Sequence, residues 1–340
     1  IDKYCYLTCR YLPPFFDHRI RVVYSEIENC QRADEIKHPA VREVLGFLGI
    51  KRGVEIHHDG DLPARSGMGS SSAFTVGLLN ALHALKGEMP SKQQLARESI
   101  TVEQERLQEV VGSQDQVLAA YGGLNHVSFM TNGEISVRPV TLPAERIGEL
   151  KSHLLMFYSG VKRTASEVAS TYANDLEARR QQLRIMNDFV EEGLSILSGR
   201  EDITRFGKLL REAWQTKQSL SAKVSNAYVD ELFEAALGAG AIGGKLTGAG
   251  GGGFLLLFVP PAQHQRVREA LRRLLWLPFD FEFAGSQIIF YTHERDYEIY
   301  ERLREQQKLE PSRELPTTSR RRASRAAPAR PSAARSRRKA

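Results

Sequence analysis

Apolar and polar positions in the first half of the chain alternate in some segments and follow a helical period in others. Segments rich in Tyr, Val and Ile predict strands, and longer stretches bounded by capping residues or glycine predict helices. The predicted strands span residues 2–10, 20–24 and 53–56, with a hairpin of 124–129 and 135–139 around Asn132-Gly133 further along. The predicted helices span 72–85, 92–109 and 114–121, and Ser91 with Gln94 forms a capping box for the second helix.

The second half of the chain is predicted to be more helical. It opens with a strand at 153–158 and continues with three or four helices between 165 and 237 that have long polar faces. A glycine-rich stretch then leads into predicted elements, namely a strand at 254–259, a helix at 262–275 and a strand at 287–291. The body of the chain is therefore a mixture of α and β structure, with an expected domain boundary near residue 150.

The last thirty residues differ in composition from the rest. Residues 311–340 hold ten Arg and Lys and a single acid, a net charge of +9 in a chain whose total is +6. The remaining residues therefore carry a net −3, so the basic character belongs to the tail. The tail has no large apolar residue after Leu315 and cannot bury enough surface to fold alone, so we expect 307–340 to be disordered. The alternative, a nucleic-acid-binding arm, is less favoured because no aromatic residues lie between the arginines.

Bulk composition excludes several classes of protein. The chain has 340 residues, room for about two domains, and its longest apolar run, 254–259, is too short to span a membrane. Three cysteines without regular spacing argue against a disulfide framework, and Cys5 and Cys9 are expected to be core thiols on one face of a strand. No signal-peptide pattern opens the sequence. These features favour a cytoplasmic protein and leave its oligomeric state open.

A small-residue loop that leads into a helix is the first candidate for chemistry. Residues 61–73 read DLPARSGMGSSSA, with Gly67 and Gly69 before three serines in the first helical turn. Small residues let the backbone approach an anion, and the free N–H groups at a helix start bind phosphate. The Lys-Ser/Thr ending of a P-loop is absent. The alternative is an ordinary serine N-cap.

An acid on the apolar face of the predicted helix 92–109 is the second candidate. Projected at 100° per residue, Glu103 falls within the stripe of Ala96, Ile100 and Leu107, whereas Glu105 points away from it. A buried carboxylate needs a partner, because leaving it unpaired is costly. That partner is either a divalent cation or an Arg or Lys side chain.

Asp115 is the third candidate, at the start of the predicted helix 114–121. An acid in the first turn commonly complements the helix dipole. The alternative is a general base that orients and deprotonates an attacking hydroxyl.

The glycine-rich stretch 238–253 is the fourth candidate. It contains nine glycines in sixteen residues and runs directly into an apolar strand, which is unusual for a flexible linker. Glycine packing of this kind marks a close approach of the backbone to another group. Thr247 and Gly248 are expected to line a phosphate or a substrate.

Taken together, these segments resemble the GHMP kinase superfamily of galacto-, homoserine, mevalonate and phosphomevalonate kinases. Residues 63–73 are similar to its phosphate-binding motif, and 245–253 to its C-terminal glycine motif. Residues 112–116, followed by Gly122-Gly123, are similar to the segment that bears its catalytic aspartate. The similarity runs from about residue 1 to 305. The family's first strand and its basic glycine-rich motif are not found, so we expect both to be absent from a chain that opens at Ile1.

The resemblance implies an α+β fold of two domains, an ATP-binding domain like ribosomal protein S5 domain 2 at 1–150 and a ferredoxin-like domain at 151–306. It implies ATP and Mg²⁺ as cofactors and Asp115 as the base. Ser71 and Glu103 would hold the Mg²⁺. The residues that would bind ATP are Pro63, Gly67, Met68, Gly69, Ser70, Ser71 and Ser72. Those that would line the substrate are Thr247, Gly248, Gly250, Lys162 and Arg163, with Lys217 as a further candidate.

Within the superfamily, residues 34–39, 114–116, 119–125 and 245–254 are most similar to kinases of D-glycero-D-manno-heptose 7-phosphate. This similarity implies transfer from ATP to the anomeric hydroxyl of a small sugar phosphate, without a covalent enzyme intermediate. Two alternatives stay open: a kinase of fucose or another hexose at C1, and a truncated relative that binds nucleotide or sugar without catalysis. Retained Asp115, Glu103 and Ser71 speak against the second alternative.

Overall fold

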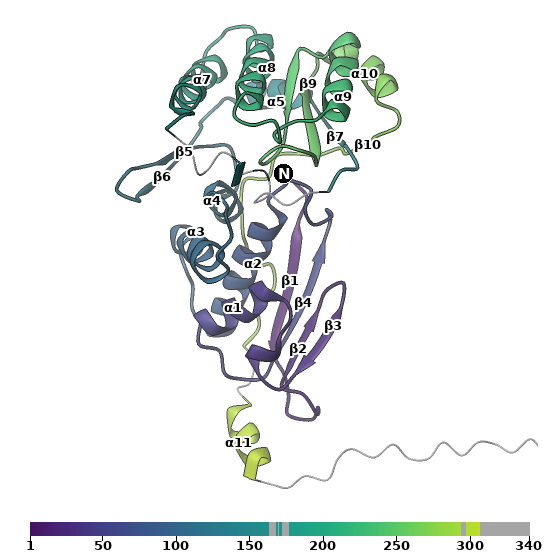
Figure 1. The fold of residues 1–340 in the computed structure, drawn as a ribbon. Coiled ribbons are helices and arrows are strands. Elements are labelled where there is room, and N and C mark those ends of the chain that lie inside the picture. The colour runs from purple at the N-terminus through teal and green to yellow at the C-terminus, as the bar shows by residue number, and fades with distance from the viewer. Residues whose placement is uncertain (163–167, 169, 172–176, 294–296, 307–340) are drawn as a thin grey trace, which may run out of the picture.

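The computed structural model describes residues 1–162, 168, 170–171, 177–293 and 297–306 (Figure 1). Arg163 and the tail 307–340 lie outside these residues, so the expectations for them stay predictions. The molecule is elongated, with purple and blue elements of the N-terminal half below and green elements of the C-terminal half above. The mixed α and β composition expected from the sequence is confirmed.

A four-stranded sheet forms one layer of the N-terminal half. Its order is β1 (Cys5–Tyr11), β4 (Val54–Gly60), β2 (Ile20–Val23), β3 (Ile27–Cys30). Only the central β4–β2 pair is parallel, and the outer pairs are antiparallel. In β1, side chains alternate between partly buried and exposed, the pattern of a strand with one face on a core. Cys5 and Cys9 lie on its inner side and pack against the core, as expected from their spacing.

Four helices cover one face of this sheet (Figure 1). They are α1 (Pro39–Phe47), α2 (Ser70–Leu85), α3 (Lys92–Thr101) and α4 (Gln114–Tyr121). Helix α2 lies in the middle, where Val76, Leu78 and Leu79 are fully buried. Complete burial of each such side chain contributes about 1.5–3 kcal/mol, so α2 anchors the half of the molecule that carries its N-terminal loop.

The predicted helix 92–109 ends earlier than expected. Ser91 caps α3 by accepting the Gln94 N–H, but the α-helix stops at Thr101 and gives way to a π-helical turn, Val102–Arg106. Gln108 then adopts a positive φ of 54°. A π-turn widens the helix by one residue, and turns of this kind occur frequently at functional sites.

An antiparallel sheet forms the core layer of the C-terminal half. Its order is β10 (Leu275–Trp276), β7 (Leu154–Tyr158), β9 (Phe254–Phe258), β8 (Gly243–Leu246). The helices around it are α5 (Ala144–Ser152), α7 (Arg180–Ser198), α8 (Thr204–Gln218), α9 (Ala227–Gly238) and α10 (His264–Ala270). Leu150 of α5 packs with Phe258 of β9, so α5 packs on the sheet of the C-terminal half. It does so although it precedes residue 153, where the first strand of this half was predicted to begin. A separate hairpin, β5 (Asn125–Phe129) with β6 (Ile135–Pro139), confirms the turn expected at Asn132-Gly133.

Of the elements predicted near the C-terminal end, one helix is shorter than expected and one strand is wrong. The helix expected over 262–275 is only the seven residues of α10, because the chain reverses at 271–274 to form β10. The strand expected over 287–291 does not form. Its apolar alternation is real, but the segment pairs with no described strand, and Ile289 and Phe290 are 82% and 81% exposed. Alternating apolar residues indicate that a segment can form a strand, but a strand forms only where another strand is available to pair with it.

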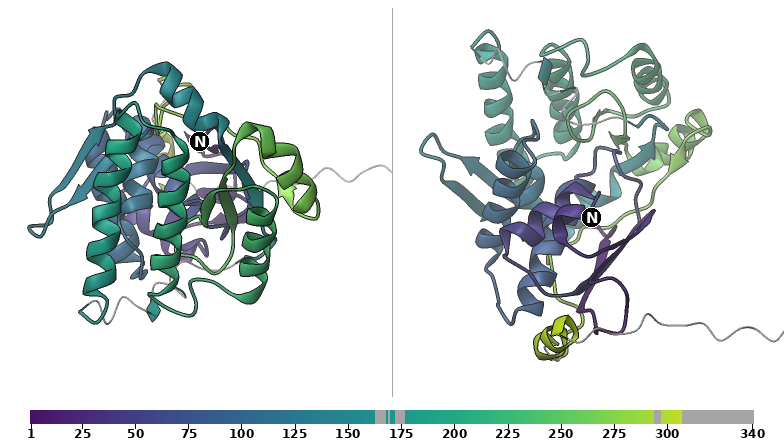
Figure 2. Two further views of the ribbon diagram at one scale, coloured as in Figure 1. Left: turned by 90° about the horizontal axis from the view of Figure 1, so that it is seen from above. Right: turned by 60° about the horizontal axis from the view of Figure 1, so that its bottom comes forward.

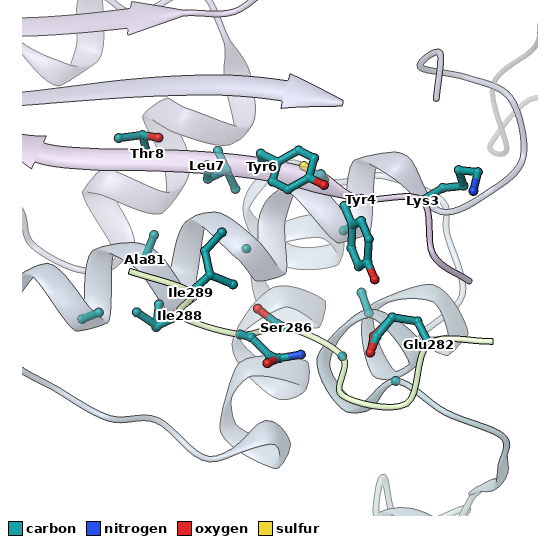
Figure 3. Close-up of a pocket in the computed structure, with 18 of the residues that line it drawn as sticks. Lys3, Tyr4, Tyr6, Leu7, Thr8, Ala81, Glu282, Ser286, Ile288 and Ile289 are labelled. Atoms are coloured by element: carbon teal, nitrogen blue, oxygen red, sulfur yellow. The ribbon is translucent and has the colours of Figure 1, made fainter. Parts of the chain in front are cut away.

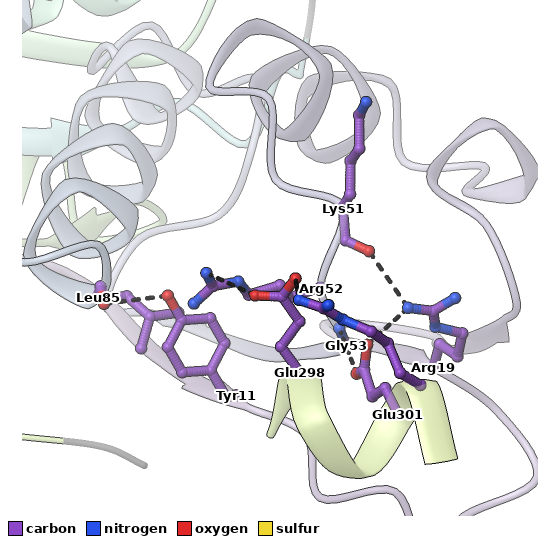
Figure 4. Close-up of polar contacts among 9 residues, drawn as sticks. Tyr11, Arg19, Lys51, Arg52, Gly53, Leu85, Glu298 and Glu301 are labelled. Atoms are coloured by element: carbon purple, nitrogen blue, oxygen red, sulfur yellow. Dashed lines mark hydrogen bonds and ion pairs between the residues drawn. The ribbon is translucent and has the colours of Figure 1, made fainter. Parts of the chain in front are cut away.

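The chain after β10 returns to the N-terminal half. Asp2 N–H donates to Asp280 O and Gly123 N–H donates to Glu282 O, at 3.0 and 2.7 Å. The segment ends in α11 (Glu298–Gln306), which lies at the far end of the N-terminal half (Figure 2, right). There Glu301 accepts the Gly53 N–H at 2.9 Å and pairs with Arg19 at 2.6 Å (Figure 4). The C-terminal segment thus leaves the sheet of the C-terminal half and forms hydrogen bonds with the N-terminal half.

Glu28 on β3 accepts hydrogen bonds from the loop before α1, and this interaction makes the stability of the fold depend on pH. Burial alone would raise its pKa, but hydrogen bonds donated by the N–H groups of Lys37 and His38 and by the Tyr24 hydroxyl outweigh it, so the pKa of Glu28 lies below its usual value. Its stabilisation is complete above the ordinary glutamate pKa of about 4.3 and is lost as the pH falls through the lower folded-state pKa.

Glu28→Gln is therefore expected to lower the free energy of unfolding by about 1.5–3 kcal/mol at pH 7, because it weakens hydrogen bonds made to a charged group. The difference from wild type should shrink as the pH falls below about 4. Urea denaturation at a series of pH values measures it. Glu26→Gln, at an exposed acid two residues away, is the matched control. An equal effect of both substitutions would contradict this role of Glu28.

No described helix is both long and apolar enough to cross a membrane.

Candidate functional site

The N-terminus of α2 is open and presents unpaired N–H groups. Gly69 occupies the N-cap with a φ of 67°, and no side chain caps the helix. The first intrahelical bond runs from Ala73 N–H to Gly69 O, at 2.8 Å. The N–H groups of the three preceding serines therefore have no acceptor within the helix, and the positive end of the dipole adds to their effect. This geometry can hold an anion, as expected for residues 63–72.

Glu103 is buried beside this helix start, as the projection of its helix predicted. It is 1% exposed, and its Oε2 accepts hydrogen bonds from Ser72 Oγ, at 3.0 Å, and from Gln116 Nε2. Its Oε1 is buried and has no hydrogen-bond partner among the residues that the structure describes. Burial raises the pKa of Glu103, and the hydrogen bonds from Ser72 and Gln116 only partly oppose this rise.

The partners of Glu103 bear on the two explanations of its burial, a divalent cation or an Arg or Lys side chain. No Arg or Lys pairs with it among the described residues; its partners are the Ser72 hydroxyl and the Gln116 amide. A carboxylate oxygen left free in such a setting suits Mg²⁺, which takes oxygen ligands and usually keeps several waters. The hydroxyl in contact is that of Ser72, whereas the side chain of Ser71 is exposed at the helix start. The structure therefore adds Ser72 as the residue that orients Glu103, a role that could not be assigned among the three serines from the sequence.

Asp115 lies against the N-cap of α2. A Cβ built on Gly69 would come within 3.3 Å of Asp115 Oδ2 and 3.2 Å of its Cβ. Asp115 Oδ1 accepts a hydrogen bond from Gln114 Nε2 at 3.2 Å. The first turn of α4 thus sets a carboxylate directly beside the open helix start, and a side chain at position 69 would be strained by the positive φ and crowded against Asp115.

The two glycine-rich loops meet backbone to backbone. A Cβ on Gly248 would lie 2.8 Å from Gly67 O, and one on Gly253 would lie 2.1 Å from Ser66 O. Gly250 packs as closely on the backbone of Val224. We call this contact, between residues 66–69 and 247–253, the glycine junction. It contains two buried hydroxyls, those of Ser66 and Thr247, for which the described part of the chain offers no hydrogen-bond partner.

The three cationic candidates differ in their surroundings. Lys217 Nζ donates to Gly248 O at 2.5 Å and thereby supports the glycine junction. Lys162 is exposed, and it follows Val161, whose carbonyl accepts the Gly253 N–H at 2.9 Å. Arg163 lies outside the described residues. Lys162 is therefore near the junction and available to a ligand, whereas Lys217 already bonds the protein.

A groove of about 720 Å³ leads from this site along β1. It reaches Met68, Gly69 and Asp115 at one end and runs between β1 and the segment 282–289 (Figure 3). Among the polar side chains that line it are those of Lys3, Tyr4, Tyr6, Thr8, Glu282 and Ser286. Sequence reasoning missed these residues. The alternation of Tyr4, Tyr6 and Thr8 was the available signal, and contributions from residues 282 and 286 required the tertiary structure.

The comparisons with known proteins agree with this geometry. The family model described as GHMP kinases N terminal domain matches residues 35–123, and the one described as GHMP kinases C terminal matches 193–275. A D-glycero-alpha-D-manno-heptose 7-phosphate kinase of Campylobacter jejuni is 28% identical over 262 residues, 76% of this chain and 77% of the relative. A mevalonate kinase of Methanothermobacter thermautotrophicus is 30% identical over 291 residues, 80% of this chain and 90% of the relative.

A solved structure shares the fold. The crystal structure of a D-glycero-D-manno-heptose 1-phosphate kinase from Bacteroides thetaiotaomicron superposes with a TM-score of 0.66 at 22% identity, and the match covers 86% of this chain and 89% of the other. The two-domain architecture expected from the resemblance is thereby confirmed. The N-terminal match contains the α2 loop, Glu103 and Asp115, and the C-terminal match contains the glycine loop. The chain belongs to the GHMP kinases, phosphotransferases that use an alcohol group as acceptor.

Proposed function

We propose that the protein transfers the γ-phosphoryl group of ATP to the anomeric hydroxyl of D-glycero-D-manno-heptose 7-phosphate. The observation that carries the proposal is the contact between Asp115 and Gly69, which sets a carboxylate beside an open helix N-terminus at the end of a groove. A base, a phosphate site and an acceptor site then adjoin one another. Phosphoryl transfer depends mainly on such positioning.

The proposed reaction is a direct in-line displacement. The acceptor oxygen forms a bond to the γ-phosphorus as the bond from that phosphorus to the β,γ-bridging oxygen breaks. The bridging oxygen keeps the bonding electrons and leaves on ADP. The hydroxyl proton passes to the carboxylate of Asp115, which then releases it to water. The N–H groups of Ser70, Ser71 and Ser72, together with the loop from Pro63 to Gly69, hold the phosphates.

Glu103 and Ser71 would hold a Mg²⁺ ion, which when bound would offset charge on the transferring phosphates. The buried, unpartnered Oε1 of Glu103 supports this assignment. Ser72 and Gln116 keep the other carboxylate oxygen in place. Their role is therefore to orient Glu103.

The choice of a heptose phosphate rests on the Campylobacter relative and on the sequence segments similar to that group of kinases. Thr247, Gly248 and Gly250 would adjoin the substrate, and the buried free hydroxyl of Thr247 supports this role. Lys162 and Arg163 would pair with the phosphate that the sugar already carries. Curated relatives also include a bifunctional fucokinase of Arabidopsis thaliana, 28% identical over 228 residues, so a hexose kinase is the second candidate.

A substrate panel tests the proposal. ADP release by the purified chain with ATP and Mg²⁺ should be fastest with D-glycero-D-manno-heptose 7-phosphate and slower with fucose, galactose, mevalonate and unphosphorylated heptose. The expected loss on removing the 7-phosphate is about 10²-fold or more in kcat/KM, because a charged hydrogen-bonding partner is lost. Faster turnover of an unphosphorylated hexose would replace the heptose assignment with the second candidate. Binding of ATP without turnover of any acceptor would support a non-catalytic relative.

A further inference from the structure

Helix α11 has its charged side against the protein and its apolar side toward solvent. Glu301 accepts the Gly53 N–H at 2.9 Å and pairs with Arg19 at 2.6 Å (Figure 4). One turn earlier, Glu298 pairs with Arg52 at 3.3 Å. A surface helix ordinarily buries its apolar stripe and leaves its charged side in water. The orientation of α11 is therefore the reverse of the usual one.

The outward side of α11 carries three large apolar residues. Ile299, Tyr300 and Leu303 are 69%, 57% and 47% exposed. At 100° per residue they fall within one arc of about 100°, and Glu298 and Glu301 lie on the opposite side of the helix. Apolar residues scattered singly over a surface are ordinary, but several of them grouped on one face indicate a surface that binds another molecule.

A strongly basic segment follows α11 in the sequence. Residues 311–340 carry a net charge of +9, and residues 320–340 contain nine Arg and Lys and no acid. The proposed phosphoryl transfer uses none of these residues. An apolar helix face next to a polybasic segment supplies the two signals that together hold a protein on an anionic lipid surface.

Charge and apolar contact together select the molecule that fits this face. A second copy of the chain would cover the apolar residues, but it would bring another net charge of +9 to the same place. DNA or RNA would neutralise the tail, but its phosphates would leave Ile299 and Leu303 in water. An anionic membrane satisfies both, because its headgroups attract the tail and its acyl boundary accepts the apolar side chains.

We propose that the C-terminal region binds the protein to the surface of an anionic membrane. Helix α11 lies at the membrane interface with Ile299, Tyr300 and Leu303 inserted, and residues 311–340 hold it there by charge. The two acids of α11 that anionic headgroups would repel face arginines of the protein instead. This interaction does not depend on the proposed reaction.

The position of α11 leaves the candidate active site open in this arrangement. The helix lies at the far end of the N-terminal half (Figure 1). Asp115 and Gly69 lie beside the glycine junction, where this half meets the C-terminal half. The chain can therefore bind a membrane through α11 and still exchange small molecules with the surrounding solution.

Sedimentation of the full chain with lipid vesicles tests the proposal. The chain should bind vesicles of phosphatidylcholine and phosphatidylglycerol in equal amounts, should not bind pure phosphatidylcholine, and should be released by salt. Leu303→Ser should lower the partition coefficient by about 10-fold, because an inserted apolar side chain is lost. Val190→Ser is the matched control, since Val190 on α7 is 45% exposed, and it should bind as wild type does. Equal binding of both variants would overturn the role of α11.

Changes of charge and a second probe separate the membrane from other partners. The triple substitution Arg320→Gln, Arg321→Gln and Arg322→Gln should lower the partition coefficient by about 10²-fold, because three cations no longer meet anionic headgroups. Double-stranded DNA of random sequence is the second probe. Binding to DNA without binding to anionic vesicles would assign the tail to nucleic acid. A dimer that Leu303→Ser dissociates, in a chain that binds no vesicles, would assign the apolar face to a second copy; either result overturns the proposal.

A fluorescence measurement shows whether α11 enters the lipid. Tyr300→Trp adds an indole on the outward side of α11, in a chain whose own tryptophans, Trp214 and Trp276, lie in the C-terminal half. Phospholipids with brominated acyl chains should quench the added emission when vesicles bind. Vesicle binding with unquenched emission would mean that the tail binds without α11, and would overturn the proposal. Leu303→Ser should keep wild-type ADP release in solution, so failure of the membrane proposal and failure of the kinase assignment remain distinguishable.

Discussion

Asp115→Asn is expected to reduce kcat by about 10³-fold, within the range reported for loss of a general base. Asparagine has nearly the same shape and can still accept the hydrogen bond from Gln114, but it cannot take the hydroxyl proton. The contact with Gly69 is kept, so the N-terminus of α2 should still bind ATP. ADP release measures turnover, and the shift of the thermal unfolding midpoint with ATP measures binding.

Asp188→Asn serves as the control, because Asp188 is an exposed acid on α7 away from the site. It should retain wild-type turnover. Loss of turnover in Asp115→Asn with unchanged stabilisation by ATP would separate catalysis from nucleotide binding. Full activity of Asp115→Asn would remove Asp115 as the base and leave its position beside Gly69 with a purely structural role.

Gly253→Ala is expected to cause the largest loss of stability among the substitutions considered. Gly253 has a φ of 94°, and a Cβ there would meet Ser66 O at 2.1 Å, which forces one of the two loops to move. The cost should be about 3–5 kcal/mol, because backbone strain and overpacking add. Opening the junction should also weaken ATP binding, since residues 66–69 lead into the N-terminus of α2.

Gly133→Ala is the control that separates the cost of a positive φ from the cost of the steric clash with Ser66. Gly133 has a similar φ of 82° in the β5–β6 turn, with no atom within 4 Å of the added Cβ. It should lose only about 1–2 kcal/mol, the cost of the left-handed conformation itself. Urea denaturation of both variants, with ATP titrations at a temperature where both are folded, measures the difference. Equal losses would mean that the glycine junction yields easily and does not hold the two halves in register.

Local elements of this protein could be predicted wherever the chain's own geometry decides them. The helix after residue 69 follows from its apolar residues and the glycine that ends it, Gly87. The hairpin follows from the turn dipeptide Asn132-Gly133 between two strand-like segments. The inward direction of Glu103 also followed from a period of 100° per residue. Glu103 is buried as predicted even though it lies in a π-helical turn, which the period did not predict. Such features depend on neighbours a few residues apart.

Features that depend on distant segments could not be predicted this way. Residues 287–291 alternate as a strand would, yet no described strand pairs with them, because pairing requires a free edge at the right place. Ser72 rather than Ser71 contacts Glu103, since adjacent helix positions point 100° apart and the packing of α2 on the π-helical turn selects one of them.

The sequence by itself determined the family, the order of its motifs and the local form of the loops that carry them. Only the tertiary structure closed Gly253 on Ser66 and laid residues 282–289 beside β1. The physical reason is range. Backbone preferences act over a few residues, so the local sequence is enough to predict them. Contacts between residues 130 or more positions apart form only after two hydrophobic cores have packed, because the packed cores determine where the loops between their elements meet.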